Sequence, residues 1–401
     1  MSGLSVVGIG ADGWAGLGDA ARDELRRART IVGSGRQLEL LPTELGAERL
    51  LLPSPLEPFL DRLAADREEG TCVLASGDPM LHGIGASLAR RAGAAGLRVH
   101  PHPSAFSLAC ARLGWPAAEV DLVSAVGRPT AVVARLLQPG RRLIAYVTGD
   151  DGARAVARLV TERGYGPSRL VVLERLGSPA ERLVESTAET FDAAAEPPHA
   201  VALEVRGAPD LAPRPLTPGL PDDAYESDGQ LTKRHVRAVT LAALAPTPRS
   251  LLWDVGAGSG SIAIEWLRAE PTATAVAIER DPERAARIER NAERLGVPDR
   301  LTVVRVEAPG AFAGLGRPAA VFVGGGLTAP NLLDICWARL GRGGRLVANA
   351  VTLEGERILG AARSARGGSL TRLEIAQARP LGGFSGWRPQ MPVVQWAVGK
   401  S

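Results

Sequence analysis

Short apolar runs alternate with segments of helical periodicity in the C-terminal half of the chain. The apolar runs predict strands at 250–255, 274–279, 301–306, 319–323, 344–350, 370–378 and 392–398. Apolar residues at helical spacing predict helices at 230–244, 261–268, 282–295, 329–340 and 354–365. Strands that alternate with helices indicate a parallel sheet covered by helices on both faces. The last two predicted strands follow each other without a helix.

The N-terminal half has the same alternation and is also predicted to be α/β. Its predicted strands are 4–9, 29–33, 71–75, 97–101, 120–124, 142–147, 169–174 and 200–205. Its predicted helices are 19–28, 56–69, 83–95, 104–113, 130–137 and 151–163.

Residues 207–224 separate the halves and differ from them in composition. The stretch contains five prolines, Pro209, Pro213, Pro215, Pro218 and Pro221. Prolines at this density exclude a helix or a central strand and indicate an extended, semi-rigid linker. The 401 residues exceed one typical core. We therefore expect one domain over 1–206, a linker over 207–224 and a second domain over 225–401.

Charge and composition exclude several classes of protein. Lys and Arg total 47 against 44 Asp and Glu, and this net charge of +3 does not indicate a nucleic-acid-binding protein. Lys233 and Lys400 are the only lysines. The arginine excess fits either codon bias or bidentate binding of a carboxylate-rich ligand. No apolar run is long enough to span a membrane, and the N-terminus lacks the basic region of a signal peptide.

The cysteines indicate a reducing compartment. There are three of them, Cys72, Cys110 and Cys336, scattered along the chain without a C-x-x-C pair. This pattern argues against a disulfide framework and against a zinc site, and it is typical of a protein in the reducing cytoplasm. His100 and His102 share one face of a predicted strand but have no acidic or cysteine companion, so we expect no metal site.

The clearest chemical signal lies between residues 251 and 279. A strand ends in Gly256-Ala-Gly258-Ser-Gly260, a helix follows, and a second strand ends at Glu279. Glycines allow a ligand to approach the backbone closely, and the helix start offers free N–H groups. Glu279 lies about 20 residues beyond the glycines, where a carboxylate binds ribose hydroxyls. The pattern predicts a nucleoside-cofactor site at the carboxyl ends of parallel strands.

The spacing of this loop distinguishes between cofactors. A dinucleotide fingerprint reads G-x-G-x-x-G, whereas here the third glycine comes one residue early. Asp254 stands two residues before Gly256, and the resulting D-x-G-x-G-x-G resembles motif I of class I S-adenosylmethionine methyltransferases. The resemblance implies a seven-stranded Rossmann-like sheet with an antiparallel edge hairpin. It places Asp254 at the amino-acid end of the cofactor.

Gly8-Ile-Gly10-Ala-Asp-Gly13 also spells G-x-G-x-x-G, but its second strand ends at Gly33 without an acidic residue. The interpretation of this loop as an NAD-binding site is therefore disfavoured. An N-terminal V-x-G-x-G, then Ser76-Gly-Asp-Pro79, then Pro103-Ser104 resemble the class III tetrapyrrole methylases. That family has two α/β subdomains with S-adenosylmethionine folded between them. Ser124-Ala-Val-Gly-Arg128 narrows the resemblance to late-precorrin methylases, but lacks the expected histidine two residues before the arginine.

The C-terminal half resembles the decarboxylating precorrin methyltransferases. The resemblance rests on Asp228–Lys233, Val236-Arg237, Trp253–Gly256, Ile262–Trp266, Val323–Gly326 and Asn349–Glu354. Together the halves resemble a fused, bifunctional family. It implies methylation of precorrin-6Y at C5 by the first half, and C15 methylation with loss of an acetate carboxyl group by the second, giving precorrin-8X in cobalamin biosynthesis. The equivalent steps on cobalt-precorrins are an alternative, as is a non-catalytic binding role for the first half.

The resemblance implies two S-adenosylmethionine sites per chain. Ile9, Asp78, Leu81, Ser104 and Ala105 would bind the N-terminal cofactor. The C-terminal cofactor residues would be Thr232, Asp254, Gly256, Ala257, Gly258, Ser259, Gly260, Glu279 and Ala308. A polycarboxylate tetrapyrrole would be the substrate, and we expect a homo-oligomer.

No catalytic acid is evident from the sequence. Lys233, His235 and Arg237 lie on the helix before motif I, with Lys233 and Arg237 one turn apart. We expect this face to meet substrate carboxylates, with a solvated basic face as the alternative; His235 is either an acid or a surface histidine. Phe384 and Trp387 would form either a flap over the macrocycle or a packed hairpin tip.

Overall fold

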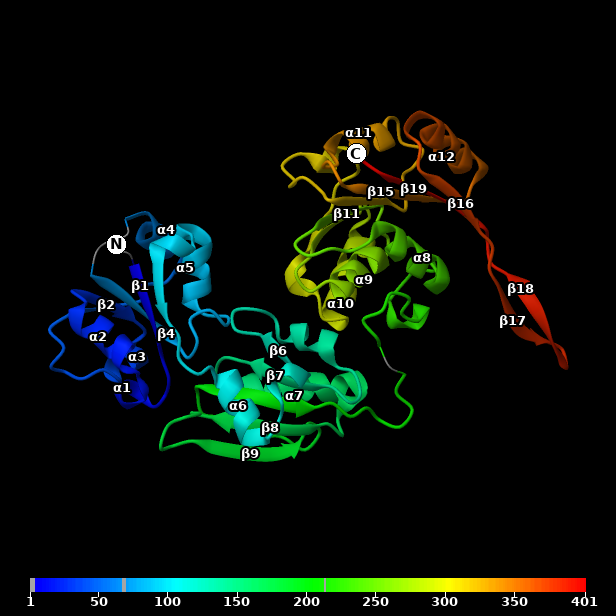
Figure 1. The fold of residues 1–401 in the computed structure, drawn as a ribbon. Coiled ribbons are helices and arrows are strands. Elements are labelled where there is room, and N and C mark those ends of the chain that lie inside the picture. The colour runs from blue at the N-terminus through cyan, green and yellow to red at the C-terminus, as the bar shows by residue number, and fades with distance from the viewer. Residues whose placement is uncertain (1–3, 67–69, 213) are drawn as a thin grey trace. The chain divides into compact units, whose positions relative to one another are not determined.

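The structure is a computed structural model that describes residues 4–66, 70–212 and 214–401. Pro213 of the predicted linker lies outside the described residues. The chain forms two compact units (Figure 1). The first comprises Met1–Thr130 and Pro139–Leu211, and the second comprises Ala131–Gln138 and Ala212–Ser401. The second boundary falls within the proline-rich stretch.

The first sheet of the first unit is parallel, in the order β3-β2-β4-β1-β5. Its strands are β1 (Leu4–Ile9), β2 (Thr30–Gly33), β3 (Glu48–Leu51), β4 (Thr71–Ser76) and β5 (Leu97–His100). Its helices are α1 (Gly13–Gly16), α2 (Asp19–Arg27), α3 (Gly35–Glu39), α4 (Glu57–Asp66) and α5 (Ile84–Ala92). The central strand β1 is buried along its whole length, as continuous apolar strands of parallel sheets are.

The second sheet of this unit has the order β6-β7-β10-β8-β9, and only β6 and β7 pair in parallel. Its strands are β6 (Val120–Ser124), β7 (Arg142–Tyr146), β8 (Arg169–Glu174), β9 (Arg182–Thr187) and β10 (His199–Glu204). The helices here are α6 (Ala105–Leu113) and α7 (Gly152–Val160). The predicted helix at 130–137 is a 3₁₀ helix, η3 (Thr130–Leu136), which from Ala131 onward belongs to the second unit.

The second unit contains the predicted seven-stranded sheet, in the order β13-β12-β11-β14-β15-β19-β16. Its strands are β11 (Leu251–Val255), β12 (Thr274–Ile278), β13 (Leu301–Val304), β14 (Ala320–Val323), β15 (Arg345–Ala350), β16 (Ser369–Leu373) and β19 (Val393–Gly399). β19 is antiparallel to both neighbours, and the other pairs are parallel. The α/β fold class and the antiparallel edge hairpin are thus confirmed.

Five helices cover this sheet, together with the short 3₁₀ helix η5 (Asp222–Ala224) in the last part of the predicted linker. They are α8 (Arg234–Leu244), α9 (Ser261–Ala269), α10 (Pro282–Arg294), α11 (Leu332–Arg339) and α12 (Leu353–Arg366). Capping side chains fix two of their starts. Asp281 accepts hydrogen bonds from the N–H groups of Glu283 and Arg284, and Thr352 accepts one from Gly355.

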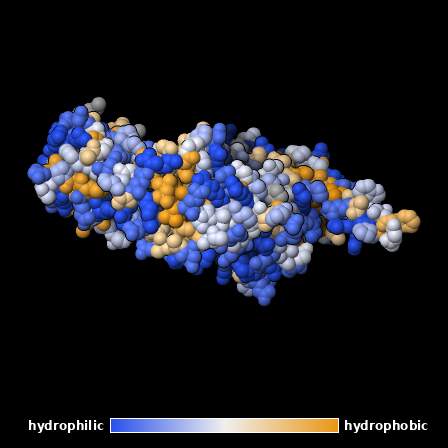
Figure 2. Space-filling view, turned by 90° about the horizontal axis from the view of Figure 1, so that it is seen from below, coloured by the Kyte–Doolittle hydropathy of each residue, from blue (hydrophilic) through white to orange (hydrophobic). Residues whose placement is uncertain are grey.

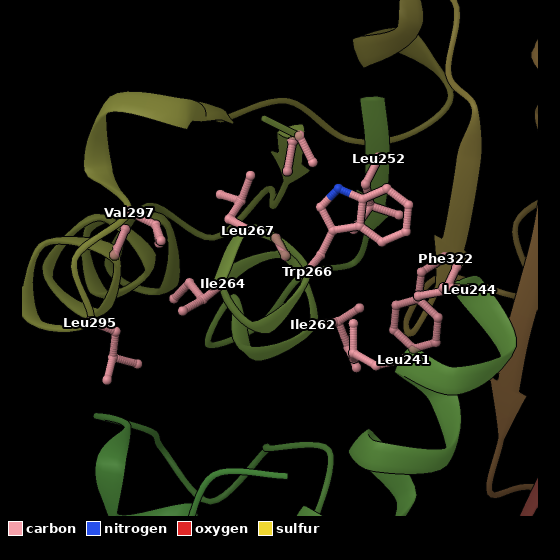
Figure 3. Close-up of a cluster of buried hydrophobic side chains, with 14 of the residues drawn as sticks. Leu241, Leu244, Leu252, Ile262, Ile264, Trp266, Leu267, Leu295, Val297 and Phe322 are labelled. Carbon is pink, nitrogen blue, oxygen red and sulfur yellow. The ribbon is translucent and has the colours of Figure 1, made fainter. Parts of the chain in front are cut away.

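Adjacent residues of β11 supply cores on opposite faces of the sheet, because successive strand side chains point to opposite sides. Leu252 packs with α8, α9 and α10, where Trp266 of α9 lies beside it (Figure 3). Trp253 belongs to the core under α11 and α12, and its ring stacks on Phe312 at a centroid distance of 4.9 Å. Burial on both faces fixes the register of β11 and therefore the position of the loop that follows it.

An antiparallel ribbon, β17 (Ala376–Leu381) and β18 (Phe384–Pro389), projects from the β16–β19 edge of the second unit (Figure 1). Its tip is hydrophobic in Figure 2, and Phe384 and Trp387 are 84% and 77% exposed. The reading of these residues as a packed hairpin tip is therefore wrong, whereas the flap stays a prediction. Among the described residues, no helix has the length and apolar character to cross a membrane.

Candidate functional site

A cavity of about 1280 Å³ opens at the carboxyl edge of the second unit's sheet. The loops that follow β11, β12, β14 and β15 all contribute to it, because parallel strands deliver their carboxyl ends to one edge. Eight predicted residues line it: Thr232, Lys233, Gly256, Ala257, Gly258, Ser259, Glu279 and Ala308.

The glycine loop owes its course to left-handed backbone conformations. Gly256, Gly258 and Gly260 have φ values of +70°, +59° and +75°, which side-chain-bearing residues rarely adopt. A Cβ on Gly256 would lie 2.6 Å from the Cα of Gly325 in the loop after β14. The two loops thus touch backbone to backbone, which leaves the cavity wall without side chains at this point.

Glu279 ties the end of β12 to the glycine loop. The residue is buried, and its carboxylate accepts hydrogen bonds from the N–H of Gly258 at 2.9 Å and of Asp281 at 3.0 Å. A carboxylate has about four acceptor positions, so both oxygens keep capacity for hydroxyl groups in the cavity. This geometry fits the predicted contact with a ribose, which stays a prediction.

Asp254 lies at the end of β11, behind the glycine loop, and only 1% of its surface is exposed. Its Oδ2 accepts a hydrogen bond from the N–H of Ala263 at 3.0 Å, whereas its Oδ1 has no hydrogen-bond partner among the described residues. Burial raises the pKa of this carboxyl group to about 7, the Ala263 hydrogen bond opposes the rise, and the Glu279 charge adds to it. A buried carboxylate oxygen without a partner is a position that favours a cationic ligand group.

The segment before α8 forms another wall of the cavity. Thr232 and Lys233 line it, and Lys233 is exposed at the N-cap position of the helix. His235 is exposed and does not line the cavity, which leaves its role a prediction.

Arg237 is fully buried, and its Nε donates to Glu265 at 2.6 Å. The expectation that Arg237 meets substrate carboxylates is therefore wrong. One helical turn separates it from Lys233, but its side chain points into the protein, where a buried carboxylate compensates the charge.

Several cavity residues were not predicted as site residues. Among them are Glu307, Gly324, Gly325, Gly326, Asn349, Val351, Gln390 and Met391. Most of them follow the carboxyl ends of predicted strands 301–306, 319–323 and 344–350, which is the signal that identifies them. Asn349 has a fixed orientation, because its Nδ2 donates to Thr240 and its Oδ1 accepts from Gln395, both at 3.0 Å.

In the first unit, the predicted residues gather at the carboxyl edge of the parallel sheet. Ile9 ends β1 next to Ser76 of β4, and its carbonyl accepts the N–H of Gly77 at 3.0 Å. Asp78 holds the following turn by accepting the N–H of Met80 at 2.8 Å. Ser104 caps α6, and a Cβ on Gly77 would lie 3.2 Å from its Cα.

Leu81 belongs to the loop that Asp78 begins, since its N–H donates to the Asp78 carbonyl at 3.2 Å. Ala105 is the first residue of α6. The structure thus brings Ile9, Asp78, Leu81, Ser104 and Ala105 to neighbouring loops, and their contact with a cofactor stays a prediction.

Two residues of this region were not singled out from the sequence. The ring of His82 meets the Tyr146 ring edge-on at a centroid distance of 6.3 Å, and the Tyr146 hydroxyl accepts the N–H of Phe106 at 2.8 Å. Burial lowers the pKa of His82, and the charge of Arg128 lowers it further. His82 has a φ of +55°, a strained value for a residue with a side chain.

Val126 occupies the position two residues before Arg128, where the resemblance to late-precorrin methylases implies a histidine.

His102 and His100 of the predicted strand face have acidic neighbours after all. His102 Nε2 lies 3.2 Å from Asp12 Oδ1, and His100 Nε2 lies 3.8 Å from Glu24 Oε2. Over the described ranges, no three His, Cys, Asp or Glu side chains are grouped so that they could hold a metal ion.

Comparison with known proteins gives matches over both halves. A family model described as a precorrin methyltransferase domain matches residues 223–400, and one for tetrapyrrole (corrin/porphyrin) methylases matches residues 3–192. A Sinorhizobium protein named precorrin-6Y C(5,15)-methyltransferase (decarboxylating) is 47% identical over 395 residues. The match covers 98% of this chain and 95% of that relative.

Two shorter relatives match parts of the chain. The cobalt-precorrin-7 C(5)-methyltransferase of Salmonella typhimurium is 33% identical over 45% of this chain and 88% of its own length. A probable cobalt-precorrin-6B C(15)-methyltransferase (decarboxylating) of Pyrobaculum calidifontis is 39% identical over 34% of this chain and 72% of its own length.

Proposed function

Because the chain belongs to the family of decarboxylating precorrin-6Y C(5,15)-methyltransferases, we propose that it methylates precorrin-6Y at C5 and C15 and removes carbon dioxide from an acetate side chain. The product would be precorrin-8X in cobalamin biosynthesis. In this proposal the first unit methylates C5, and the second unit methylates C15 and decarboxylates. The observation that carries it is the second unit's cavity, which the glycine loop and Glu279 line, with the buried Asp254 behind the loop.

The residues of this cavity fit S-adenosylmethionine, which supplies an activated methyl group when it is bound. Glu279 would accept the ribose hydroxyls, since its lone pairs are only partly used by Gly258 and Asp281. Asp254 would stabilise the cationic end of the amino-acid moiety, directly or through water. The glycine loop would let the backbone reach the ligand.

The protein's part in methyl transfer is to hold the reactants in line and to exclude water, which is worth about 7–11 kcal/mol in favourable cases. Lys233 at the cavity would bind a substrate carboxylate. Decarboxylation leaves an electron pair that the conjugated macrocycle itself accepts, so no strong base is required of the chain. A proton returned to the product carbon requires an acid.

We propose a second cofactor site in the first unit, at the loops that carry Ile9, Asp78 and Ser104. The tetrapyrrole methylase match over residues 3–192 supports it. The conformation of Gly77 supports it as well. With a φ of +61° and no side chain, Gly77 lets the loop after β4 approach the Ser104 backbone closely.

The proposal also includes a cytoplasmic homo-oligomer. A reducing compartment is supported by Cys72, Cys110 and Cys336, which are buried free thiols. Exposed apolar residues on the β17–β18 ribbon support association between copies, since exposed apolar patches mark interaction sites.

The experiment that tests the proposed function is incubation of the full chain with precorrin-6Y and isotopically labelled S-adenosylmethionine. A product with two labelled methyl groups and one carbon dioxide fewer supports the proposal, and a product without added methyl groups overturns it. Cobalt-precorrins are the second candidate substrates, because both shorter relatives are named for them. Parallel assays of metal-free and cobalt-containing substrates distinguish the two.

A further inference from the structure

The segment from Gly219 to Lys233 combines two features that the proposed reaction does not explain. Its second part, Gly229–Lys233, lines the cavity. Its first part is bound to a pair of fully buried charges, Arg237 and Glu265. We call residues 219–233 the strap.

Glu265, on α9, holds the beginning of the strap. Its carboxylate accepts the N–H groups of Gly219 at 2.5 Å and Leu220 at 3.1 Å, and the hydroxyl of Tyr225 at 2.9 Å. Burial raises the pKa of Tyr225, which keeps this hydroxyl a donor. The fourth donor is Arg237 Nε at 2.6 Å, so both oxygens of the buried carboxylate have hydrogen-bond partners.

Arg237, on α8, connects both ends of the strap. Its Nη2 donates to the Leu220 carbonyl and lies 3.3 Å from Asp222 Oδ1, while its Nη1 donates to the Thr232 carbonyl. The planar guanidinium presents its donors in a fixed fork, so it sets the spacing between these acceptors. One buried side chain thereby determines where Thr232 enters the cavity wall.

The middle of the strap is bound to α10 and passes over the glycine loop. Asn291 accepts the N–H of Glu226 at 2.9 Å and donates to the carbonyls of Glu226 and Ser259 at 3.0 Å. A Cβ on Gly258 would lie 3.6 Å from the Gln230 carbonyl, which places the strap directly against the loop. The position of the strap therefore sets the width of the cavity at the glycine loop.

We propose that Arg237 is a positioning residue for the cofactor of the second unit: through Glu265 and the Thr232 carbonyl it holds the strap at the spacing that the cofactor requires. The inference rests on the proposed function. Arg237 itself touches neither cofactor nor substrate, since its side chain is fully buried.

The test compares Arg237→Lys with a matched control, Arg268→Lys, in the full chain. Arg268 is equally buried in the same unit and donates to carbonyls of Leu295 and Arg214, which do not line the cavity. Hydrogen–deuterium exchange of residues 256–260, titrated with S-adenosylhomocysteine, gives a dissociation constant for this cavity alone. Thermal unfolding reports the loss of stability in each variant.

We expect Arg237→Lys to weaken S-adenosylhomocysteine binding by about tenfold or more, the size expected for one lost charge-assisted hydrogen bond. Exchange of residues 226–233 should become faster. Arg268→Lys should lower the unfolding temperature while its dissociation constant stays within about twofold of the wild type. An unchanged dissociation constant in Arg237→Lys, or an equal change in both variants, would overturn the proposal.

Two further results complete the test. If Arg237→Lys does not fold, Tyr225→Phe decides, because it removes only the hydroxyl that donates to Glu265; weaker binding supports the proposal and unchanged binding overturns it. If the wild type itself shows no protection of residues 256–260, the proposed function of this unit fails together with the inference. If S-adenosylhomocysteine protects residues 256–260 in the wild type, but neither Arg237→Lys nor Tyr225→Phe changes its dissociation constant, the inference alone is overturned.

Discussion

Asp254 shows how burial changes the chemistry of a single carboxyl group. Exposed aspartates are ionised at neutral pH, whereas this one has a pKa near 7 because it is desolvated beside Glu279. The raised pKa means that the folded protein holds a proton that the unfolded chain releases. Stability from this group is thus fully present below about pH 4 and is lost as the pH rises toward 7.

The protonation of Asp254 predicts a pH dependence of cofactor binding. The ionised carboxylate attracts a cation, so affinity for S-adenosylhomocysteine in the second unit should rise as the pH increases through about 7. Asp254→Asn should bind more weakly and lose this dependence. Titration calorimetry between pH 6 and pH 8.5 is the measurement, with both pH limits set about one unit or more from neutrality. A wild-type profile that is flat across this range would exclude Asp254 from the binding site.

Glu279→Ala should weaken cofactor binding to the second unit by about 1.5–3 kcal/mol, because charge-assisted hydrogen bonds to hydroxyl groups are lost. Glu307→Ala is the matched control: Glu307 also lines the cavity, but its exposed carboxylate contacts Arg280 at 2.7 Å. Calorimetry of both variants should show a large loss for the first and little for the second. Equal affinities would remove Glu279 from the ribose site.

Elements with strong apolar patterns were predictable from the sequence, and those without them were not. The inner strands of the second sheet and its helices follow the predicted pattern because both faces of β11 and its neighbours are buried. The sequence does not predict β3 and β9, since they are edge strands without a fully buried side chain. The predicted strand 370–378 is in fact β16 and the beginning of β17, because the hairpin extends beyond the sheet.

The candidate site was predictable where one motif carries it, as in the glycine loop and Glu279. The role of Arg237 was not, because helical periodicity places a residue on a face but does not show what that face contacts. Its partner Glu265 lies 28 positions away on α9. Met391 and Gln390 reach the cavity only because the β16–β19 hairpin returns there.

The glycine loop predicts a difference between two substitutions. Gly256→Ala should lower the free energy of unfolding by about 1–2 kcal/mol, because alanine disfavours the left-handed backbone conformation at this position. About 1–3 kcal/mol more follows because the Gly325 backbone must move. Gly258→Ala has the same backbone strain, but its Cβ would make only an ordinary van der Waals contact, 3.6 Å from the Gln230 carbonyl oxygen. Denaturant unfolding followed by tryptophan fluorescence should therefore show the larger loss for Gly256→Ala. Losses of equal size would mean that the contact with Gly325 does not constrain the loop.

At the scale of the whole molecule, the chain joins two units that each present loops at the carboxyl ends of parallel strands. The linker is shorter than the predicted range 207–224, because Leu220 and Ala224 are buried in the core of the second unit. Part of the proline-rich stretch is thus the beginning of the strap. We propose that each unit carries its own methyl-transfer site.

The mass of the product formed by Gly77→Val tests this claim most directly. Gly77 has a φ of +61° and lies against Ser104, so valine should close the first unit's site. Gly93→Val is the control, because Gly93 has a φ of +73° but open space around it. With precorrin-6Y, Gly77→Val should add one methyl group and release one carbon dioxide, whereas Gly93→Val should add two methyl groups. Two methyl groups added by Gly77→Val, or none while its second unit still binds S-adenosylhomocysteine, would contradict the account.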